Sequence, residues 1–408
     1  MFEYQQNTHI ALLLVGVLTA VSLFAKAVLT RFRIPALVGW IAIGVLARCA
    51  DEGLHFLDGD TERLLGFLAE VGVAVLLFRI GLESNLPRLV AQLGRAGVVW
   101  AGNVVVSGAV GYAAARFLLD LPLLTSLTIG IALTATSVGV TVGTWKHARA
   151  MDSPEGELLL DVAELDDASS IILMGLLFAA LPALQHRAGE STGAVLGGTA
   201  LSFAVRMAIF AAGCLLFARY GEARLTSRIS RLEHAPDPMI TVVGMGFVIA
   251  SVAALLGFSV ALGAFFAGLA FSRDPRAVKS EASFQPLYEL FCPFFFIHIG
   301  LGFSTVALPS AAVAAAVLLA AAVVGKTLGT VLPAAAMFDG RQASLLGISM
   351  VPRAEITMII MQRARAAGSG LIPDSLYTAM ITVSILTCVG APVAVDRMLA
   401  GRDKEARR

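Results

Sequence analysis

Long apolar runs alternate with short polar stretches through most of the sequence. A helix needs about 20 mostly apolar residues to cross a bilayer, with a range of roughly 17–25. By this criterion the sequence predicts thirteen membrane-spanning helices, of which the second and the ninth are short. The predicted spans lie near residues 9–29, 34–48, 62–82, 95–118, 122–145, 155–181, 193–218, 239–257, 259–272, 287–303, 308–336, 342–364 and 374–398. Only Gly257-Phe258-Ser259 separates the eighth span from the ninth.

The composition supports a protein that resides in the lipid bilayer. Of the 408 residues, 57% are hydrophobic and 14% are charged, against roughly 25% charged residues in a typical soluble domain. The mean hydropathy is +0.82. These values exclude a disordered chain, a fibre and an ordinary cytosolic enzyme. We therefore expect an all-α polytopic membrane protein, formed by a single domain over residues 1–408 and without a soluble regulatory domain.

Charge and cysteine usage exclude further classes of protein. The net charge of +1 gives no support for nucleic-acid binding. The four cysteines are far apart and form neither a CxxC pair nor a Cys/His cluster, so we expect no zinc site and no disulfide framework. The sequence contains no nucleophile elbow and no HExxH motif. We accordingly expect no enzymatic activity and no cofactor.

Basic residues predict the orientation of the chain in the membrane. An odd number of spans places the two termini on opposite faces. Most of the 30 lysine and arginine residues then fall on the face that carries the C-terminus. Cytoplasmic loops show this excess of positive charge. We expect a bacterial cytoplasmic (inner) membrane protein with its N-terminus outside and its C-terminus in the cytoplasm.

The sixth span carries two adjacent carboxylates where lipid is expected. A charged residue at the bilayer centre costs roughly 2.5–3.5 kcal/mol on insertion scales and usually faces a cavity or a partner. Asp166 and Asp167 lie about 16–18 Å along the helix from Glu155, near the midplane. Adjacent helical residues point about 100° apart, so one carboxylate can face a partner and the other a cavity. Two carboxylates so close resist double ionisation, which suits a site that exchanges protons for a cation.

Three further segments place polar groups at membrane depth. Lys326 lies in the eleventh span, where it either has a carboxylate partner or loses its proton; such an ion pair is structural, part of the transport cycle, or both. Pro352-Arg353-Ala354-Glu355 interrupts the twelfth span, as a kink with its own ion pair or as the lining of a cavity. Thr134–Thr141 in the fifth span is rich in hydroxyls, which supply oxygen ligands or close packing. The fifth and twelfth spans are seven apart, which indicates inverted repeats with two broken helices.

At these residues the chain resembles the bacterial monovalent cation:proton antiporters, which include the two-aspartate Na+/H+ antiporters and the K+ efflux systems. Several short motifs, spread over nearly the whole chain, carry the resemblance together. They are Leu68–Glu83, Thr136-Ser137-Val138, Asp166-Asp167, Phe294–Leu301, Lys326 and Pro352–Glu355.

The resemblance implies an arrangement of the helices. It implies a homodimer and a panel formed by helices within about 9–82 and 239–303. A linker helix at about 193–218 would join the panel to core helices within about 95–181 and 308–398. The core would move against the panel during transport.

The resemblance also implies roles for individual residues. Asp167 would bind the cation and the proton, and Asp166 would pair with Lys326. The other implied residues belong to the two crossing segments: Thr136 and Ser137 near the ion, and Arg353 and Glu355 as charges that stabilise the crossing.

Some residues depart from the family pattern. Arg79 stands where a neutral residue is usual and is expected to pair with Glu83 at i,i+4. His298 lies in a motif usually without histidine, as a pH sensor or as a packing residue. Asp161 and Glu164 precede the aspartate pair and either line a cytoplasmic funnel that attracts cations or are ordinary interfacial charges.

The function that these features favour is exchange of Na+, or of K+ or Li+, for H+ by alternating access. Cation and proton would compete for the aspartate pair, and no metal other than the transported ion is expected. A gated cation channel is an alternative, but no filter sequence such as TVGYG occurs. An organic-solute symporter of related architecture is another, and it would favour neutral polar ligands. Obligatory linkage of cation and proton fluxes separates the antiporter from both.

Overall fold

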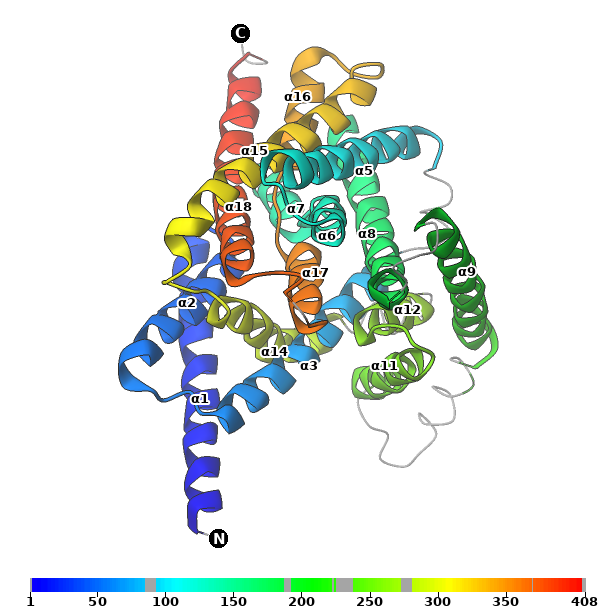
Figure 1. Ribbon diagram of the computed structural model, residues 1–408. Helices are drawn as coiled ribbons and strands as arrows, with labels where there is room; N and C mark the ends of the chain where they lie inside the picture. Colours follow the sequence, from blue (N-terminus) through cyan, green and yellow to red (C-terminus); the bar gives the residue numbers. More distant parts are fainter. Residues whose placement is uncertain are drawn as a thin grey trace. The chain divides into compact units, whose positions relative to one another are not determined.

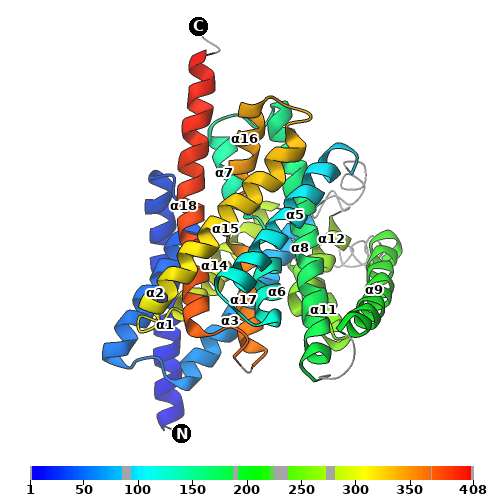
Figure 2. The ribbon, with the colours of Figure 1, turned by 45° about the horizontal axis from the view of Figure 1, so that its top comes forward.

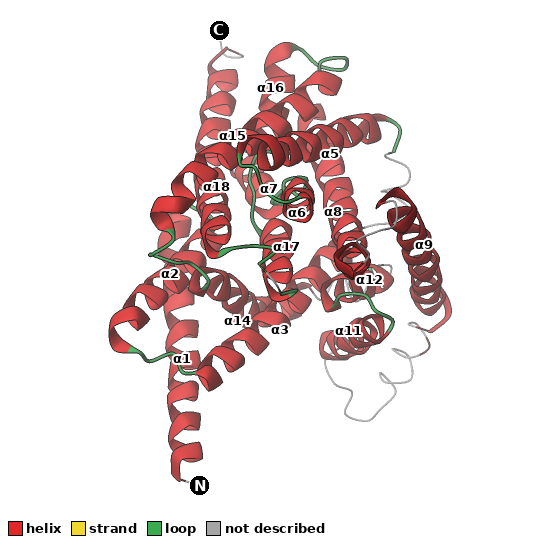
Figure 3. Cartoon of the chain, viewed as in Figure 1, coloured by secondary structure: helices red, strands yellow, loops and turns green. Residues whose placement is uncertain are grey.

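The computed structural model describes residues 2–84, 93–186, 192–221, 224, 238–272, 281–368 and 370–405. Within these ranges all regular structure is helical and no strand occurs (Figure 3). The helices are α1 (Phe2–Arg31), α2 (Ala36–Leu54), α3 (Gly59–Glu83), α5 (Arg95–Ala113), α6 (Leu123–Ala132), α7 (Val138–His147), α8 (Pro154–His186), α9 (Thr192–Leu216), α11 (Pro238–Leu255), α12 (Val260–Phe271), α14 (Glu281–Leu301), α15 (Leu308–Ala334), α16 (Gly340–Ser349), α17 (Glu355–Ala366) and α18 (Asp374–Glu405). Short π-helices, η1 (Ala114–Leu118) and η2 (Phe217–Gly221), extend α5 and α9.

The described helices confirm the expected all-α membrane fold. Among the described residues, seven segments are long and apolar enough to cross a membrane. They are Ala11–Arg31, Gly59–Glu83, Arg95–Leu118, Gly197–Gly221, Phe284–Leu301, Leu308–Ala334 and Asp374–Ala400. Each of the other predicted spans also coincides with a helix or with a pair of short helices in the described ranges. Some are shorter apolar helices, and α8 is long but carries acidic residues along its first half.

Local sequence signals explain where several helices begin. Asp58 precedes α3 and its side chain accepts a hydrogen bond from the Thr61 amide at 2.8 Å. Hydrogen bonds from Thr61 hold the pKa of Asp58 below its ordinary value, because they stabilise the ionised carboxylate. Asp339 and Gln342 form a reciprocal capping box at the start of α16. Between α11 and α12, Gly257 has a φ of +87°, a conformation that glycine adopts readily.

Two spans are interrupted, as predicted. α6 and α7 are separated by residues 133–137, and α16 and α17 by residues 350–354 (Figure 3). In the first break the Thr134 hydroxyl donates to the Ile131 carbonyl at 2.7 Å and competes with the helical backbone. In the second break Pro352 cannot continue a helix. The order of long helix, interrupted helix and long helix therefore occurs twice, in α5–α8 and in α15–α18.

The chain folds as two compact units. The first comprises Met1–Ala20, Leu57–Arg88 and Gly175–Phe296. Within it α12 packs against α3 and α11, and Phe78 of α3 contacts the rings of Phe271 and Phe284 with centroids 6.3 and 5.9 Å away. The predicted pair of Arg79 and Glu83 is present, with Nε and Oε1 2.6 Å apart.

The second unit comprises Val21–Phe56, Leu89–Met174 and Ile297–Arg408. Here α5 crosses α15 closely (Figures 1 and 2). A Cβ atom on Gly102 would lie 2.8 Å from the Gly329 carbonyl oxygen, and one on Gly325 would lie 2.9 Å from the Ser107 Cα. Such small residues let membrane helices approach closely. Because Val21–Phe56 belongs to this unit, the two units do not coincide with the predicted panel and core, and that assignment stays a prediction.

Candidate functional site

The two interrupted spans meet at their breaks in the second unit. The Ser137 amide in the first break donates to the Pro352 carbonyl in the second at 2.9 Å. The Thr136 hydroxyl donates to the Met350 carbonyl at 3.3 Å. Segments that are more than two hundred positions apart in the sequence therefore share backbone contacts, and non-helical backbone at membrane depth finds its partners in protein.

Each interrupted helix is completed by a hydroxyl from the other. The last carbonyl of α16, on Ser349, accepts from the Thr141 hydroxyl of α7 at 2.7 Å. The last carbonyl of α6, on Ala132, accepts from the Thr357 hydroxyl of α17 at 2.9 Å. Helix ends leave such carbonyls without partners in their own helix. The same device on both sides indicates that the two halves are arranged in corresponding ways.

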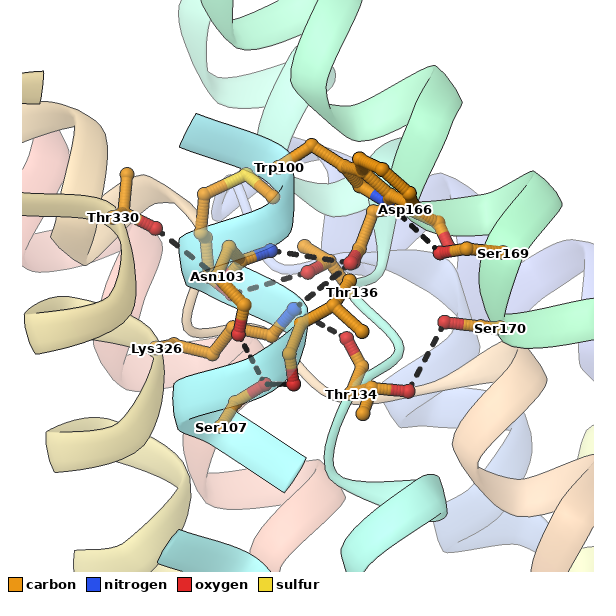
Figure 4. A network of polar contacts seen from close by, with 12 residues as sticks. Trp100, Asn103, Ser107, Thr134, Thr136, Asp166, Ser169, Ser170, Lys326 and Thr330 are labelled. Atoms are coloured by element: carbon orange, nitrogen blue, oxygen red, sulfur yellow. Dashed lines mark hydrogen bonds and ion pairs between the residues drawn. The ribbon is translucent and has the colours of Figure 1, made fainter. Parts of the chain in front are cut away.

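Lys326 and Asp166 form a fully buried ion pair beside the crossing (Figure 4). The Lys326 Nζ lies 3.0 Å from Oδ2 and 3.2 Å from Oδ1 of Asp166. The same Nζ donates to the Thr134 carbonyl just after α6. Lys326 thus joins α15 to α8 and to the first break, and it places a positive charge at the C-terminal end of a half-helix, where the helix dipole favours it.

Asn103 of α5 is a third member of this cluster, and the sequence reasoning missed it. Its Nδ2 donates to Asp166 Oδ1 at 3.1 Å, and the Thr330 hydroxyl donates to its Oδ1 at 3.4 Å (Figure 4). Asn103 is fully buried. A lone amide within the apolar run from Ala96 to Val106 was the available signal, because a buried amide requires partners.

Asp167 has different surroundings from Asp166, which precedes it in the sequence. The residue is 6% exposed, and its Oδ1 is buried without a hydrogen-bond partner among the described residues. The charged groups that act on it are Asp166, Glu355, Lys326 and Glu164. A buried carboxylate oxygen with free lone pairs is suited to bind a proton or a hard cation, which prefers oxygen ligands.

Arg353 and Glu355 lie at the second break and at the start of α17. Arg353 is fully buried, and none of its guanidinium nitrogens has a hydrogen-bond partner in the described chain. Its backbone is held by the Thr387 hydroxyl, which lies 3.1 Å from the Arg353 amide. Glu355 is the first residue of α17, where a negative charge complements the helix dipole. A Cβ atom on Gly139 of α7 would lie 3.6 Å from its Oε1.

The remaining predicted residues are Ser137, Asp161, Glu164 and His298, and they differ in burial and in neighbours. Ser137 is buried in the first break. Asp161 and Glu164 are half-buried on α8, before the aspartate pair. His298 is half-buried on α14, and its charged neighbour is Arg365 rather than an aspartate. In the described ranges no three His, Cys, Asp or Glu side chains form a metal-binding group.

A cavity of about 170 Å³ opens beside α7 within the same unit. It is lined by Thr30, Arg33, Ile34, Pro35, Ala36, Gly139, Val140, Gly143, Thr144, His147, Pro392 and Asp396. A second cavity of about 10 Å³ shares Thr144 and Pro392 with it and is also lined by Ser349 and Pro352 at the crossing. That volume is close to what one water molecule requires. Gly139 and Gly143 of α7 therefore line the larger cavity, and the smaller cavity reaches Pro352 of the second break.

Comparison with known proteins gives a consistent picture. The family described as "Sodium/hydrogen exchanger, transmembrane" matches residues 18–401. The high-affinity Na(+)/H(+) antiporter NhaS3 of Synechocystis sp. is 26% identical over 377 residues, which is 90% of this chain and 78% of that protein. The Na(+)/H(+)-K(+) antiporter GerN of Bacillus cereus is 26% identical and covers 92% of both chains.

A solved structure shares the fold. The sodium proton antiporter MjNhaP1 from Methanocaldococcus jannaschii at pH 8 superposes with a TM-score of 0.69. The match covers 96% of this chain and 98% of that chain at 12% sequence identity. At this identity the likeness concerns the fold alone.

Proposed function

Because the chain belongs to the sodium/hydrogen exchanger family, we propose that it is a membrane antiporter that exchanges a monovalent cation for protons. Na+ is the expected cation, in keeping with the names of the relatives, and GerN adds K+ to the range. The observation that carries the proposal is the buried Asp167 Oδ1, which has no hydrogen-bond partner among the described residues, beside an Asp166 whose two oxygens are hydrogen-bonded.

Competition for one carboxylate explains how the two fluxes are coupled. When Asp167 is ionised, its free oxygen lone pairs can bind a cation together with oxygen groups of the crossing. When Asp167 takes up a proton, it loses the charge that holds the cation. Since one carboxylate cannot hold both, the loaded forms carry either the cation or the proton. Exchange follows if these two forms change sides and the empty charged form does not.

The crossing supplies the polar environment that such a site needs. Four half-helix ends meet there, and their carbonyls and amides offer partial charges at membrane depth. We assign Thr136 and Ser137, two hydroxyl residues of the first break, to the surroundings of the ion. Arg353 and Glu355 balance the charges of the second break. We assign the approach of the cation to the side of Asp161 and Glu164, where acidic groups raise the local cation concentration.

The proposed domain movement, oligomeric state and membrane orientation are those that the resemblance to the antiporter family implies. Movement of a core that contains α5–α8 and α15–α18 against a panel would expose Asp167 to alternate sides. We propose a homodimer in the bacterial cytoplasmic membrane, with the N-terminus outside and the C-terminus in the cytoplasm. The described structure contributes the duplicated order of helices to this picture.

Everted membrane vesicles from a strain without its own antiporters test the function. The vesicles are acidified inside, and a pH-sensitive dye reports proton efflux when Na+, K+ or Li+ is added at a pH between roughly 6.5 and 9, where groups of this kind titrate. We expect cation-dependent alkalinisation with the parent protein and none with Asp167→Asn. Glu157→Gln, an exposed carboxylate on the same helix, is the matched control and should behave as the parent.

The outcomes separate the alternatives. Retained exchange in Asp167→Asn would remove Asp167 from the mechanism. Cation flux without linked proton movement would indicate a channel. The absence of a response to each of the cations would indicate an organic-solute carrier.

A further inference from the structure

Two aspartates that are adjacent in the sequence have opposite surroundings. Both Asp166 oxygens are occupied, by Lys326 and by the Asn103 amide. The Asp167 Oδ1 has no partner among the described residues. When neighbouring carboxylates differ in this way, their surroundings assign them different protonation behaviour. The groups around Asp166 therefore decide whether its carboxylate stays ionised during the transport cycle.

In the described chain, the polar atoms that contact the Asp166 oxygens are donors, and the other charged groups that act on this carboxylate include the Arg353 guanidinium and the adjacent Asp167. The Lys326 ammonium and the Asn103 Nδ2 donate to the Asp166 oxygens, and the acceptor atom of the same amide, Oδ1, is turned toward the Thr330 hydroxyl. While Lys326 is an ammonium, a protonated Asp166 would find no acceptor for its own hydrogen among these contacts. With Lys326 charged, the cluster therefore favours the ionised carboxylate.

The position of Asn103 leaves its amide little freedom. Its backbone carbonyl accepts from the Ser107 hydroxyl at 2.6 Å. A Cβ atom on Gly329 of α15 would lie only 2.9 Å from the Asn103 Cα, so the two helices touch at this residue. If the amide were reversed, its carbonyl oxygen would face the carboxylate and its NH2 group would face the Thr330 oxygen. The Thr330 hydroxyl can accept as well as donate, so the acceptor oxygens of the ionised Asp166 select the Nδ2 orientation, and the helix contact limits movement of the residue.

We propose that Asn103 is a positioning residue that keeps Asp166 ionised throughout the cycle, so that the exchanged proton is carried by Asp167. An ammonium can lose its proton or move away, whereas a carboxamide donates a hydrogen bond at every pH. Asn103 thereby maintains a donor on Asp166 when the contact with Lys326 weakens. This inference rests on the proposed antiport function and adds a residue that neither the motifs nor the comparisons identify.

Transport as a function of pH tests the assignment. The purified parent, Asn103→Leu, Thr330→Val and Thr128→Val are reconstituted in proteoliposomes, and exchange is measured from pH 6 to 9. Leucine matches asparagine in size without its donor. Thr128 is a buried threonine whose hydroxyl donates to the Leu124 carbonyl of its own helix, so Thr128→Val is the control for Thr330→Val.

Loss of the donor should move the pH dependence and not only the rate. A hydrogen bond to a charged group corresponds to about one pH unit or more in the balance between its two forms. We expect the pH of half-maximal exchange to rise by about one unit in Asn103→Leu and by less in Thr330→Val. Thr128→Val should match the parent. If Asn103 only packs α5 against α15, the maximal rate falls and the pH of half-maximal exchange stays the same, which would overturn the proposal.

A second readout does not depend on transport. Thermal unfolding of the purified proteins is followed between pH 5 and 9 for the parent, Asn103→Leu, Asp166→Asn and the double variant. We expect Asn103→Leu to lower the unfolding temperature most at alkaline pH and to have little pH-dependent effect when Asp166 is replaced. An equal effect in both backgrounds would refute the link to Asp166. A parent that does not exchange ions while this coupling persists would refute the antiport function alone. Should Asn103→Leu fail to fold, Thr330→Val carries both tests.

Discussion

The buried pair of Lys326 and Asp166 permits a quantitative test of how this membrane core is held together. Replacing Lys326 by Met removes the charge and keeps a side chain of similar length. At the observed 3.0 Å separation and an effective dielectric constant of about 20, the attraction between the two charges is about 5–6 kcal/mol. Removing one partner of a buried pair typically costs about 3–5 kcal/mol, because the other charge stays buried and unpaired. We therefore expect Lys326→Met to lower the free energy of unfolding by about 3–5 kcal/mol.

The double variant distinguishes pairing from general disruption. Asp166→Asn alone leaves the Lys326 ammonium buried without an opposite charge, with only uncharged acceptors such as the Thr134 carbonyl and the new amide oxygen within its reach. Lys326→Met with Asp166→Asn leaves no buried charge in the pair, and uncharged replacements of buried ion pairs are often neutral. The double variant should therefore be more stable than either single variant. Arg63→Met is the control, since Arg63 and Asp60 form an exposed pair at 3.1 Å and exposed pairs contribute about 0–1 kcal/mol.

Unfolding of the purified protein in detergent, followed by tryptophan fluorescence, provides the measurement. Trp145 is fully buried and its Nε1 donates to the Ser349 hydroxyl at the crossing, so its emission reports the integrity of the site. If the double variant loses as much free energy of unfolding as the two single variants together, the two charges do not stabilise each other. A loss for Lys326→Met no larger than that for Arg63→Met would likewise refute the reasoning.

Two further predictions concern the crossing and the cavity beside it. Thr357→Val removes the hydroxyl that donates to the Ala132 carbonyl. We expect the free energy of unfolding to fall by about 1–3 kcal/mol in the same experiment, because this is the usual cost of an unsatisfied buried polar group. An unchanged free energy of unfolding would show that the carbonyl finds another partner. Gly143→Leu fills the cavity beside α7, where a Cβ atom meets no atom within 4 Å, so exchange should slow while the unfolding temperature stays close to that of the parent. Gly213→Leu, on an exposed position of α9 with equally open space, is its control, and equal exchange rates in the two variants would exclude the cavity from the transport route.

The contacts of the aspartate pair show where sequence reasoning reached its limit. Adjacent helical positions point in different directions, so the sequence predicts that one carboxylate faces a partner and the other does not. The resemblance assigned the pairing with Lys326 to Asp166, and the structure has this contact. Neither source included Asn103, whose partners on α8 and α15 are far from it in the sequence. The same holds for Thr141 and Thr357, which each complete a helix of the opposite half.

The sequence by itself determined that this is a helical membrane protein with two interrupted spans and with charges at membrane depth. These features are local, because the apolar length needed to cross a bilayer, the breaking effect of proline and the cost of a buried charge are each visible in one segment. Only the tertiary structure decided which polar groups meet. Partners such as Asn103 with Asp166, or Ser137 with Pro352, are selected by the close crossing of helices, and no single segment contains that geometry.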